Sequence, residues 1–158
     1  MQVILDTDFL SAFLKIGRLN LVREFFKEAT LVIPVEVAQE VARARLLAEM
    51  LREQEIRVEV LHPSEGEEPE GFEKLGEGEK ACLRLALRRE DAVLLSNDNK
   101  ARKVARKLGL KAYSIPEFLL ACKIVGLASK EDLEEMVRLL MERDKYRFKA
   151  QVLKDLLK

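Results

Sequence analysis

The sequence predicts a three-layer α/β fold, in which helices cover both faces of a central parallel sheet of five strands and further helices follow at the C-terminus. Short apolar runs rich in β-branched residues alternate with longer segments whose apolar residues recur at helical spacing. Strands that are separated by helices are joined by right-handed crossovers, which makes the sheet parallel. The 158 residues are enough for one domain with a substantial core and too few for two ordinary domains.

The first half of the chain predicts two buried strands and three helices. The apolar run at residues 3–5 ends at Asp6, which indicates a strand followed by a helix start. Apolar residues at helical spacing then predict two successive helices. The run at 31–33 predicts the second strand, and Pro34 suits the first turn of a helix over about 35–53.

The second half begins with a third strand, in which Ile56, Val58 and Val60 alternate with charged residues. Residues 64–77 are rich in Gly, Pro and Glu and predict a long mobile loop. A helix, a strand, a helix with Gly109 as its C-terminal cap, a strand and three helices are expected next. Their expected ranges are 77–90, 92–95, 98–108, 111–113, 116–125, 130–143 and 147–157.

Composition excludes several classes of protein. Apolar residues make up 48% of the chain, but no apolar run is long enough to cross a bilayer, and the N-terminus does not resemble a signal peptide. We therefore expect a soluble, cytoplasmic protein without a membrane partner. Cys82 and Cys122 stand among apolar neighbours and predict inert packing, while the lone His62 predicts a surface loop, so a zinc site is not expected.

Charges are unevenly distributed although the formal net charge is zero. Residues 65–79 contain seven Glu and one Lys, whereas residues 84–107 contain eight Lys or Arg and three acidic residues. A basic stretch beside an acidic segment would suit a phosphate-bearing substrate that approaches a metal ion. The alternative is a heat-adapted surface of ion pairs, which the many Lys and Glu would equally explain.

Four carboxylates occupy positions that a folded α/β chain would normally give to other residues. Asp6 and Asp98 stand at the carboxyl ends of predicted strands, where ligands bind in open parallel sheets. Glu40 and Glu79 fall within the apolar stripes of predicted helices. If the first and fourth strands are neighbours, the four acids converge in one crevice. Buried carboxylates are costly unless a cation neutralises them, and hard oxygen ligands select Mg²⁺ or Mn²⁺.

Structural alternatives exist for each of these acids. The two strand-end aspartates suit helix N-caps, and Glu79 suits the positive end of a helix dipole. Surface ion pairs are the other alternative, between Glu40 and Arg43 and between Asp98 and Arg102.

Small polar residues stand beside the strand-end aspartates in a chain with only two Thr and three Asn. Thr7 follows Asp6, while Ser96 and Asn97 precede Asp98. We expect Thr7, Ser96 and Asn97 to orient the metal-binding carboxylates through hydrogen bonds. Helix capping is the alternative role for these residues.

Four segments together resemble the PIN-domain family. They are VILDTD at 3–8, IPVEVAQEV at 33–41, LGEGE at 75–79 and LLSND at 94–98, in the order that this family shows. The resemblance covers about residues 1–125, and the remainder resembles stand-alone prokaryotic PIN proteins with extra C-terminal helices. It implies a PIN-like nuclease domain at 1–127, a helical extension at 128–158 packed on the same domain, and the strand order 3-2-1-4-5.

The resemblance also implies a function. The metal-binding and catalytic acids of the family fall on Asp6, Glu40, Glu79 and Asp98, and Asn97 departs from the pattern because relatives often have a second acid there. Family members are typically Mg²⁺- or Mn²⁺-dependent ribonucleases, many of them toxins of toxin–antitoxin pairs. The expected partners are therefore an RNA substrate, an antitoxin protein and a second copy in a homodimer.

The expected reaction is metal-assisted hydrolysis of phosphodiester bonds in RNA. A bound metal ion lowers the pKa of its water and stabilises negative charge in the transition state. Basic residues after Asp98 are candidates to neutralise substrate phosphates, although a solvated helix face explains them equally well. They are Lys100, Arg102, Lys103 and Arg106.

Two other functions remain open at this point. A strand followed by Asp6-Thr7-Asp8 also resembles haloacid-dehalogenase-like phosphatases, in which Asp6 would be the nucleophile and Asp8 the acid/base. Leu10 departs from that motif, and Glu40 and Glu79 would have no role in it. The other alternative is a catalytically inactive PIN-like scaffold that binds RNA or protein, since the C-terminal helices carry apolar stripes that could hold a partner.

Overall fold

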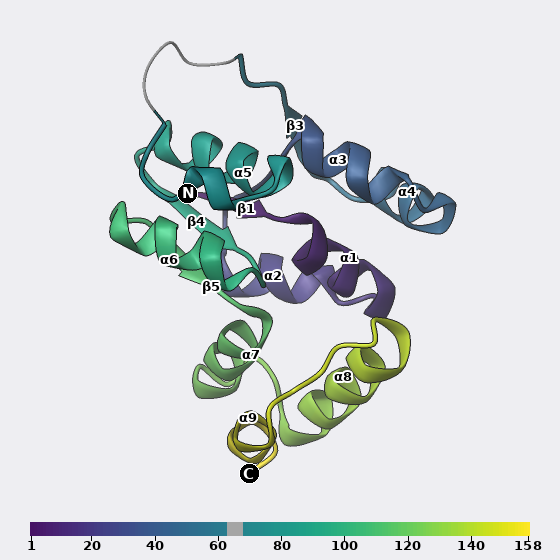
Figure 1. Ribbon diagram of the computed structural model, residues 1–158. Helices are drawn as coiled ribbons and strands as arrows, with labels where there is room; N and C mark the ends of the chain where they lie inside the picture. The colour runs from purple at the N-terminus through teal and green to yellow at the C-terminus, as the bar shows by residue number, and fades with distance from the viewer. Residues whose placement is uncertain (63–67) are drawn as a thin grey trace.

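A central parallel sheet organises the computed structural model, which describes residues 1–62 and 68–158. Within these residues the strand order is β3-β2-β1-β4-β5, and both the predicted fold class and the predicted order are confirmed (Figure 1). Val3 of the central strand pairs with Leu31 on one side and with Val93 on the other. The strands are β1 Gln2–Leu5, β2 Thr30–Pro34, β3 Arg57–Glu59, β4 Ala92–Leu95 and β5 Lys111–Tyr113.

Helices cover both faces of this sheet. In Figure 1, α3 and α5 lie above the sheet, while α2 and the C-terminal helices lie below it. Among the described helices, none combines the length and apolarity that a bilayer crossing needs. The helices are α1 Thr7–Ile16, α2 Leu19–Phe25, α3 Val35–Ala42, α4 Arg45–Arg52, α5 Glu77–Leu87, α6 Asn99–Lys107, α7 Ile115–Ile124, α8 Lys130–Arg143 and α9 Ala150–Leu156.

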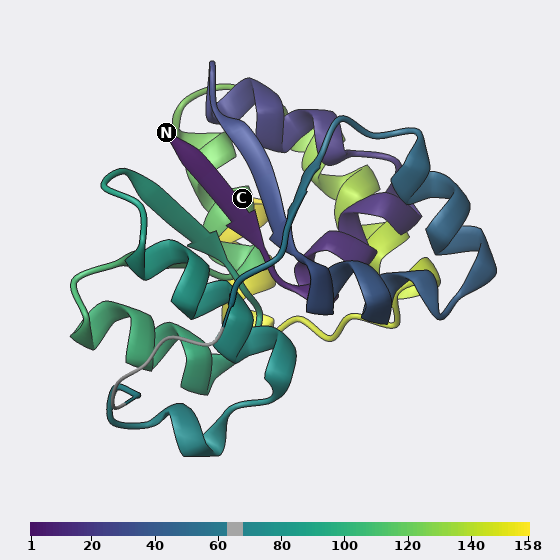
Figure 2. The ribbon, with the colours of Figure 1, turned by 90° about the horizontal axis from the view of Figure 1, so that it is seen from above.

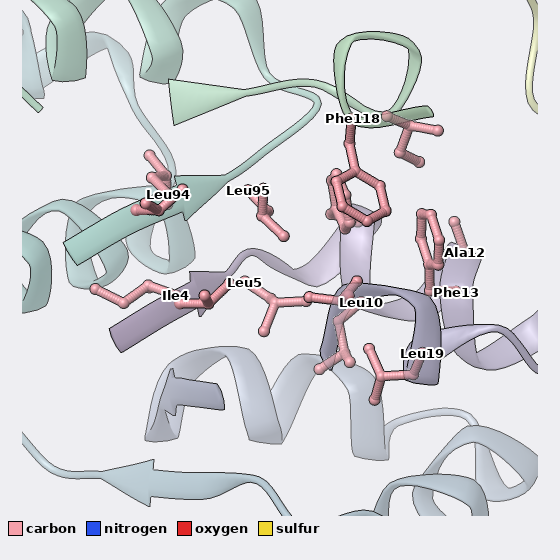
Figure 3. Close-up of a cluster of buried hydrophobic side chains, with 14 of the residues drawn as sticks. Ile4, Leu5, Leu10, Ala12, Phe13, Leu19, Leu94, Leu95 and Phe118 are labelled. Atoms are coloured by element: carbon pink, nitrogen blue, oxygen red, sulfur yellow. The ribbon is translucent and has the colours of Figure 1, made fainter. Parts of the chain in front are cut away.

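The buried core includes the sheet strands and the helices packed on them, and phenylalanine rings from α1 and α7 form one part of it. Phe9 and Phe13 stack at 5.0 Å between ring centroids, and Phe118 of α7 meets both rings edge-on. Figure 3 labels Phe13 and Phe118 of this cluster. Helix α8 packs against α1, and its buried Leu133 and Leu140 belong to the same core. The C-terminal helices thus hold α1, which carries the residues that follow β1, in a fixed position.

The predicted single helix over 35–53 is wrong. Helix α3 ends at Ala42, and Ala44 has an extended backbone with φ −92° and ψ 117° before α4 begins. The apolar stripe therefore does not continue from Val41 through the second helix. The break turns α4 so that Leu47 and Met50 pack against the core, which places them beside α1.

The third predicted strand is present but shorter than expected. Strand β3 spans Arg57–Glu59 at the edge of the sheet, so Ile56 and Val60 lie outside it, and Val58 and Val60 are 48% and 67% exposed. Of the predicted mobile loop at 64–77, residues 64–67 lie outside the described residues. The described part is anchored by buried Phe72, in a 3₁₀ turn at Phe72–Lys74, and by buried Leu75. Helix ends otherwise differ by a few residues, and α9 begins at Ala150 rather than 147.

Candidate functional site

The carboxyl ends of β1 and β4 bring two distant parts of the chain together. Leu5 pairs in register with Leu95, so Asp6 and Ser96 leave the sheet side by side. The Asp6 amide donates a hydrogen bond of 3.0 Å to the Leu95 carbonyl, which holds the residues after β1 next to the end of β4. The order of neighbouring strands therefore places the first acidic segment against the fourth strand, as expected for ligand sites in open parallel sheets.

Asp6 is the most buried carboxylate of this edge, with 5% of its surface exposed. Its Oδ1 accepts a hydrogen bond of 2.9 Å from the Phe9 amide, and its Oδ2 accepts one from the Ser96 hydroxyl. Burial nevertheless raises the pKa of Asp6 to about 7, with smaller contributions from the negative charges of Asp8 and Glu79. At neutral pH this carboxylate is therefore poised between its charged and neutral forms.

Ser96 connects Asp6 with Asp98. While its hydroxyl donates to Asp6, its Oγ accepts from the Asp98 amide at 3.1 Å. Oδ1 of Asp98 accepts from the Ala101 amide at 2.7 Å, so both strand-end aspartates also serve as the helix N-caps expected as their structural alternative. In the described part of the chain, Oδ2 of Asp98 accepts no hydrogen bond, which leaves it available to a ligand.

Glu40 and Glu79 come to the same place from α3 and α5. Oε2 of Glu40 accepts a hydrogen bond of 2.7 Å from the Thr7 hydroxyl, which holds its carboxylate over the start of α1. Burial is the main cause of a raised Glu79 pKa, followed by the charge of Asp98. A cavity of about 50 Å³ opens between these side chains. Its walls are Asp6, Thr7, Asp8, Glu40, Gly78 and Glu79.

Two glycines make room for the glutamates. A Cβ at Gly78 would lie 2.8 Å from Oε1 of Glu40, and a Cβ at Gly76 would collide with Oε2 of Glu79. In each case the clashing atom is the end of a flexible side chain, so a larger residue would move the carboxylate more readily than the backbone. The LGEGE segment therefore supplies both a carboxylate and the space for its neighbour.

Replacing Gly78 with alanine is expected to separate function from stability. The thermal midpoint should stay the same or rise, because alanine is the better helix former by as much as about 1 kcal/mol. Metal-dependent activity should fall about tenfold, the scale expected when the orientation of a metal ligand is lost. Thermal melts and Mn²⁺-dependent RNA cleavage measure the two effects. Glu77→Ala, on the exposed side of the same helical turn, is the control, and full activity in Gly78→Ala would contradict this role.

Asp8 belongs to the site, although the sequence assigned it a role only in the phosphatase alternative. It lines the carboxylate cavity, and its pKa is raised by burial first and then by the charges of Asp144, Glu40 and Asp98. The sequence feature that could have indicated this role is the position of Asp8, two residues after Asp6 in the first turn of a helix. Asp144 gave no such signal, because it reaches this region from the far end of α8.

Carboxylate oxygens suit a hard divalent cation, but in this structure the predicted ligands are not close enough to one another to bind one ion together. Within residues 1–62 and 68–158, no group of three Asp, Glu, His or Cys side chains is close enough to hold a metal ion. Over the same residues, none of the four predicted ligands forms an ion pair with Lys or Arg, so their charge is not neutralised by the protein. Mutual repulsion, together with donors such as Thr7 and Ser96, accounts for carboxylates that line the cavity without closing on its centre.

Asn97 and the predicted phosphate-binding cations are placed differently from the acids. Oδ1 of Asn97 accepts a hydrogen bond of 3.0 Å from the Ile115 amide, at the start of α7, whose N-cap is Ser114. Arg102 donates to the Ser96 carbonyl at 2.8 Å, and Arg106 bonds to both oxygens of Glu117. Lys100 and Lys103 are exposed and line a separate cavity of about 470 Å³, which shares no residue with the carboxylate cavity.

Comparison with known proteins gives the site a family context. The model of the family DUF3368, described as a PIN domain, matches residues 2–158. The structure of the PIN domain endonuclease Utp24 is similar in fold, with a TM-score of 0.55 and 13% identity over 72% of this chain and 84% of that one. A domain of a functionally unknown protein from Methanocaldococcus jannaschii has a TM-score of 0.46 and 27% identity, over 72% and 90% of the two chains. No curated protein matches the sequence.

Proposed function

Because the chain belongs to the PIN-domain family, whose model spans residues 2–158, we propose that it is a Mg²⁺- or Mn²⁺-dependent endoribonuclease. The observation that supports this most strongly is the small cavity lined by Asp6, Asp8, Glu40 and Glu79, without a neutralising cation from the described residues. The partial desolvation of these acids is costly unless a cation enters.

Asp6, Glu40, Glu79 and Asp98 would hold the metal ion, with Asp8 as a further candidate. When bound, the ion supplies a more acidic water and stabilises negative charge on the phosphate. The protein's own groups hold the carboxylates in place, since Thr7 and Ser96 donate to them and Gly78 leaves space. With the Asp6 pKa at about 7, binding of a cation below this pH also requires the loss of its proton.

The experiment that tests the proposal is cleavage of a labelled single-stranded RNA by the purified protein. We expect cleavage with Mn²⁺ and none with excess EDTA. Glu40→Gln keeps the Thr7 hydrogen-bond acceptor but removes a charge, and its rate should fall by about 10²-fold or more. Glu49→Gln, on exposed α4, should match wild type. Equal cleavage by Glu40→Gln and wild type, or cleavage that survives EDTA, would refute the proposal.

One observation favours a second function, that of a PIN-like module that binds RNA or protein without cutting it. The described carboxylates are not gathered closely enough to form a ready metal site. Exposed apolar residues that could contact a partner add to this alternative, and they are Leu46, Ile124, Val125 and Met141. A toxin role with an antitoxin, and a homodimer, are further proposals that the same surfaces support.

The phosphatase alternative is disfavoured, because both oxygens of the buried Asp6 already accept hydrogen bonds.

A further inference from the structure

A groove beside the carboxylate cavity carries positive charge that the metal site does not use. The segment 144–149, which we call the strap, connects α8 to α9 and runs back along the molecule in yellow (Figure 2). It is tied to α1 at its start, where Lys15 donates to Oδ1 of Asp144 at 2.9 Å. Arg143 adds a hydrogen bond of 3.1 Å to the Lys15 carbonyl.

This groove has a volume of about 500 Å³ and adjoins the carboxylate cavity, because Asp8 lines both. Three cations face it, against two acids, and one of these acids is paired with Lys15. The groove also presents the ring of Tyr146, whose centroid lies 4.6 Å from that of Phe148. The lining residues are Asp8, Ser11, Lys15, Asn97, Asp144, Lys145, Tyr146 and Arg147.

Lys145 and Arg147 are the free cations of the groove. Both are exposed, and neither forms an ion pair within the described residues. Lys145 also has a φ of +59°, a conformation that glycine adopts without strain and that disfavours other residues. This backbone conformation does not require a lysine, and the exposed charge of Lys145 is therefore available to a ligand in the groove.

We propose that the strap groove binds backbone phosphates of single-stranded RNA next to the phosphate that is cleaved. The inference rests on the proposed function, since it places the substrate across the carboxylate cavity. Lys145 and Arg147 neutralise neighbouring phosphates, and Tyr146 offers a ring to an unpaired base. Cations combined with an aromatic ring are what proteins use to bind single strands without sequence preference. In this arrangement the strap, rather than α6, provides the main phosphate contacts.

The test is fluorescence anisotropy of a labelled single-stranded RNA, titrated in EDTA over a series of salt concentrations. Lys145→Gly with Arg147→Gln should weaken binding about tenfold and reduce the slope of log affinity against log salt by about 1.4, or about 0.7 for each lost phosphate contact. Thermal melts should show no loss of stability, because glycine suits the backbone at 145. Lys145→Arg should keep the wild-type slope. The control is Lys27→Gln with Lys111→Gln, two exposed lysines next to the amino ends of β2 and β5.

The outcomes separate this inference from the proposed function, because binding is measured without metal. An unchanged slope in the strap variant, or an equal change in the control, would overturn the inference. Absence of RNA binding by a wild-type protein that cleaves RNA with Mn²⁺ would also overturn it, while the proposed function would stand. Strap-dependent binding by a protein that cleaves nothing would support the groove and refute the nuclease.

Discussion

Replacing Asp6 with asparagine is expected to stabilise the metal-free protein at pH 8 while abolishing its activity. The folded-state pKa of Asp6 is about 7, above its ordinary value of 3.8. The folded protein therefore binds this proton more tightly than the unfolded chain, and the associated stability is present below pH 4 and is lost as the pH rises through 7. About three pKa units correspond to about 4 kcal/mol. Asparagine stays neutral and avoids much of this loss.

Thermal melts of metal-free protein at pH 5 and pH 8 measure this effect. Asp6→Asn should raise the melting temperature at pH 8 by several degrees, because about 2 kcal/mol shifts a domain of this size by about 4 to 8 °C. The difference from wild type should shrink at pH 5. Mn²⁺-dependent cleavage should fall about 10³-fold, since a metal ion contributes several kcal/mol to catalysis. Asp155→Asn, in α9, is the control, and an Asp6→Asn protein that is less stable at pH 8 would contradict the burial argument.

Replacing Asp98 with asparagine should remove activity without changing stability. Asn and Asp are about equally good N-caps, so the hydrogen bond from the Ala101 amide should survive and the free energy of unfolding should change by less than about 0.5 kcal/mol. Cleavage should fall by about 10² to 10³-fold, because Asn97 beside it carries no charge that could replace the lost ligand.

Cleavage rates at saturating Mn²⁺, together with chemical denaturation, test the Asp98 variant. The matched control is Asp91→Asn, at the exposed amino end of β4. If Asp98→Asn retains wild-type activity, Asp98 is only a helix cap, and the metal site consists of the residues that line the small cavity. A large loss of stability would instead show that its charge, rather than its hydrogen bond, holds α6.

The sheet and three of the four acids could be predicted because their signals are local. Residues 3–5 and 92–95 are short apolar runs bounded by polar residues, and the structure starts and ends these strands within one residue of the expected positions. Glu40 and Glu79 stand beside buried apolar residues on two separate helices, α3 and α5, and this pattern indicates that each glutamate lies near the inward face of its own helix. The cavity that Asp6, Glu40 and Glu79 line follows from the strand order, which the family resemblance implied.

Other features depend on contacts that no short segment records. The break at Ala44 occurs without a Gly or Pro next to it in the sequence, and the helix after it, α4, packs against α1. The hydrogen bond from the Ile115 amide to Asn97 needs β4 and β5 to be neighbours. The strap groove depends on contact between Lys15 and Asp144, which are 129 residues apart in the sequence. From the sequence alone, its cations could therefore not be distinguished from ordinary solvent-exposed charges.

The most direct measurement of the central claim is a calorimetric titration of Mn²⁺ into wild-type protein at neutral pH, repeated with Asp6→Asn and Glu40→Gln. Saturable binding to the wild type, lost in both variants, is the result expected if Asp6 at the end of β1 and the acids of α3 and α5 share one cation. Heats that do not differ between the three proteins would mean that these side chains do not form a metal site.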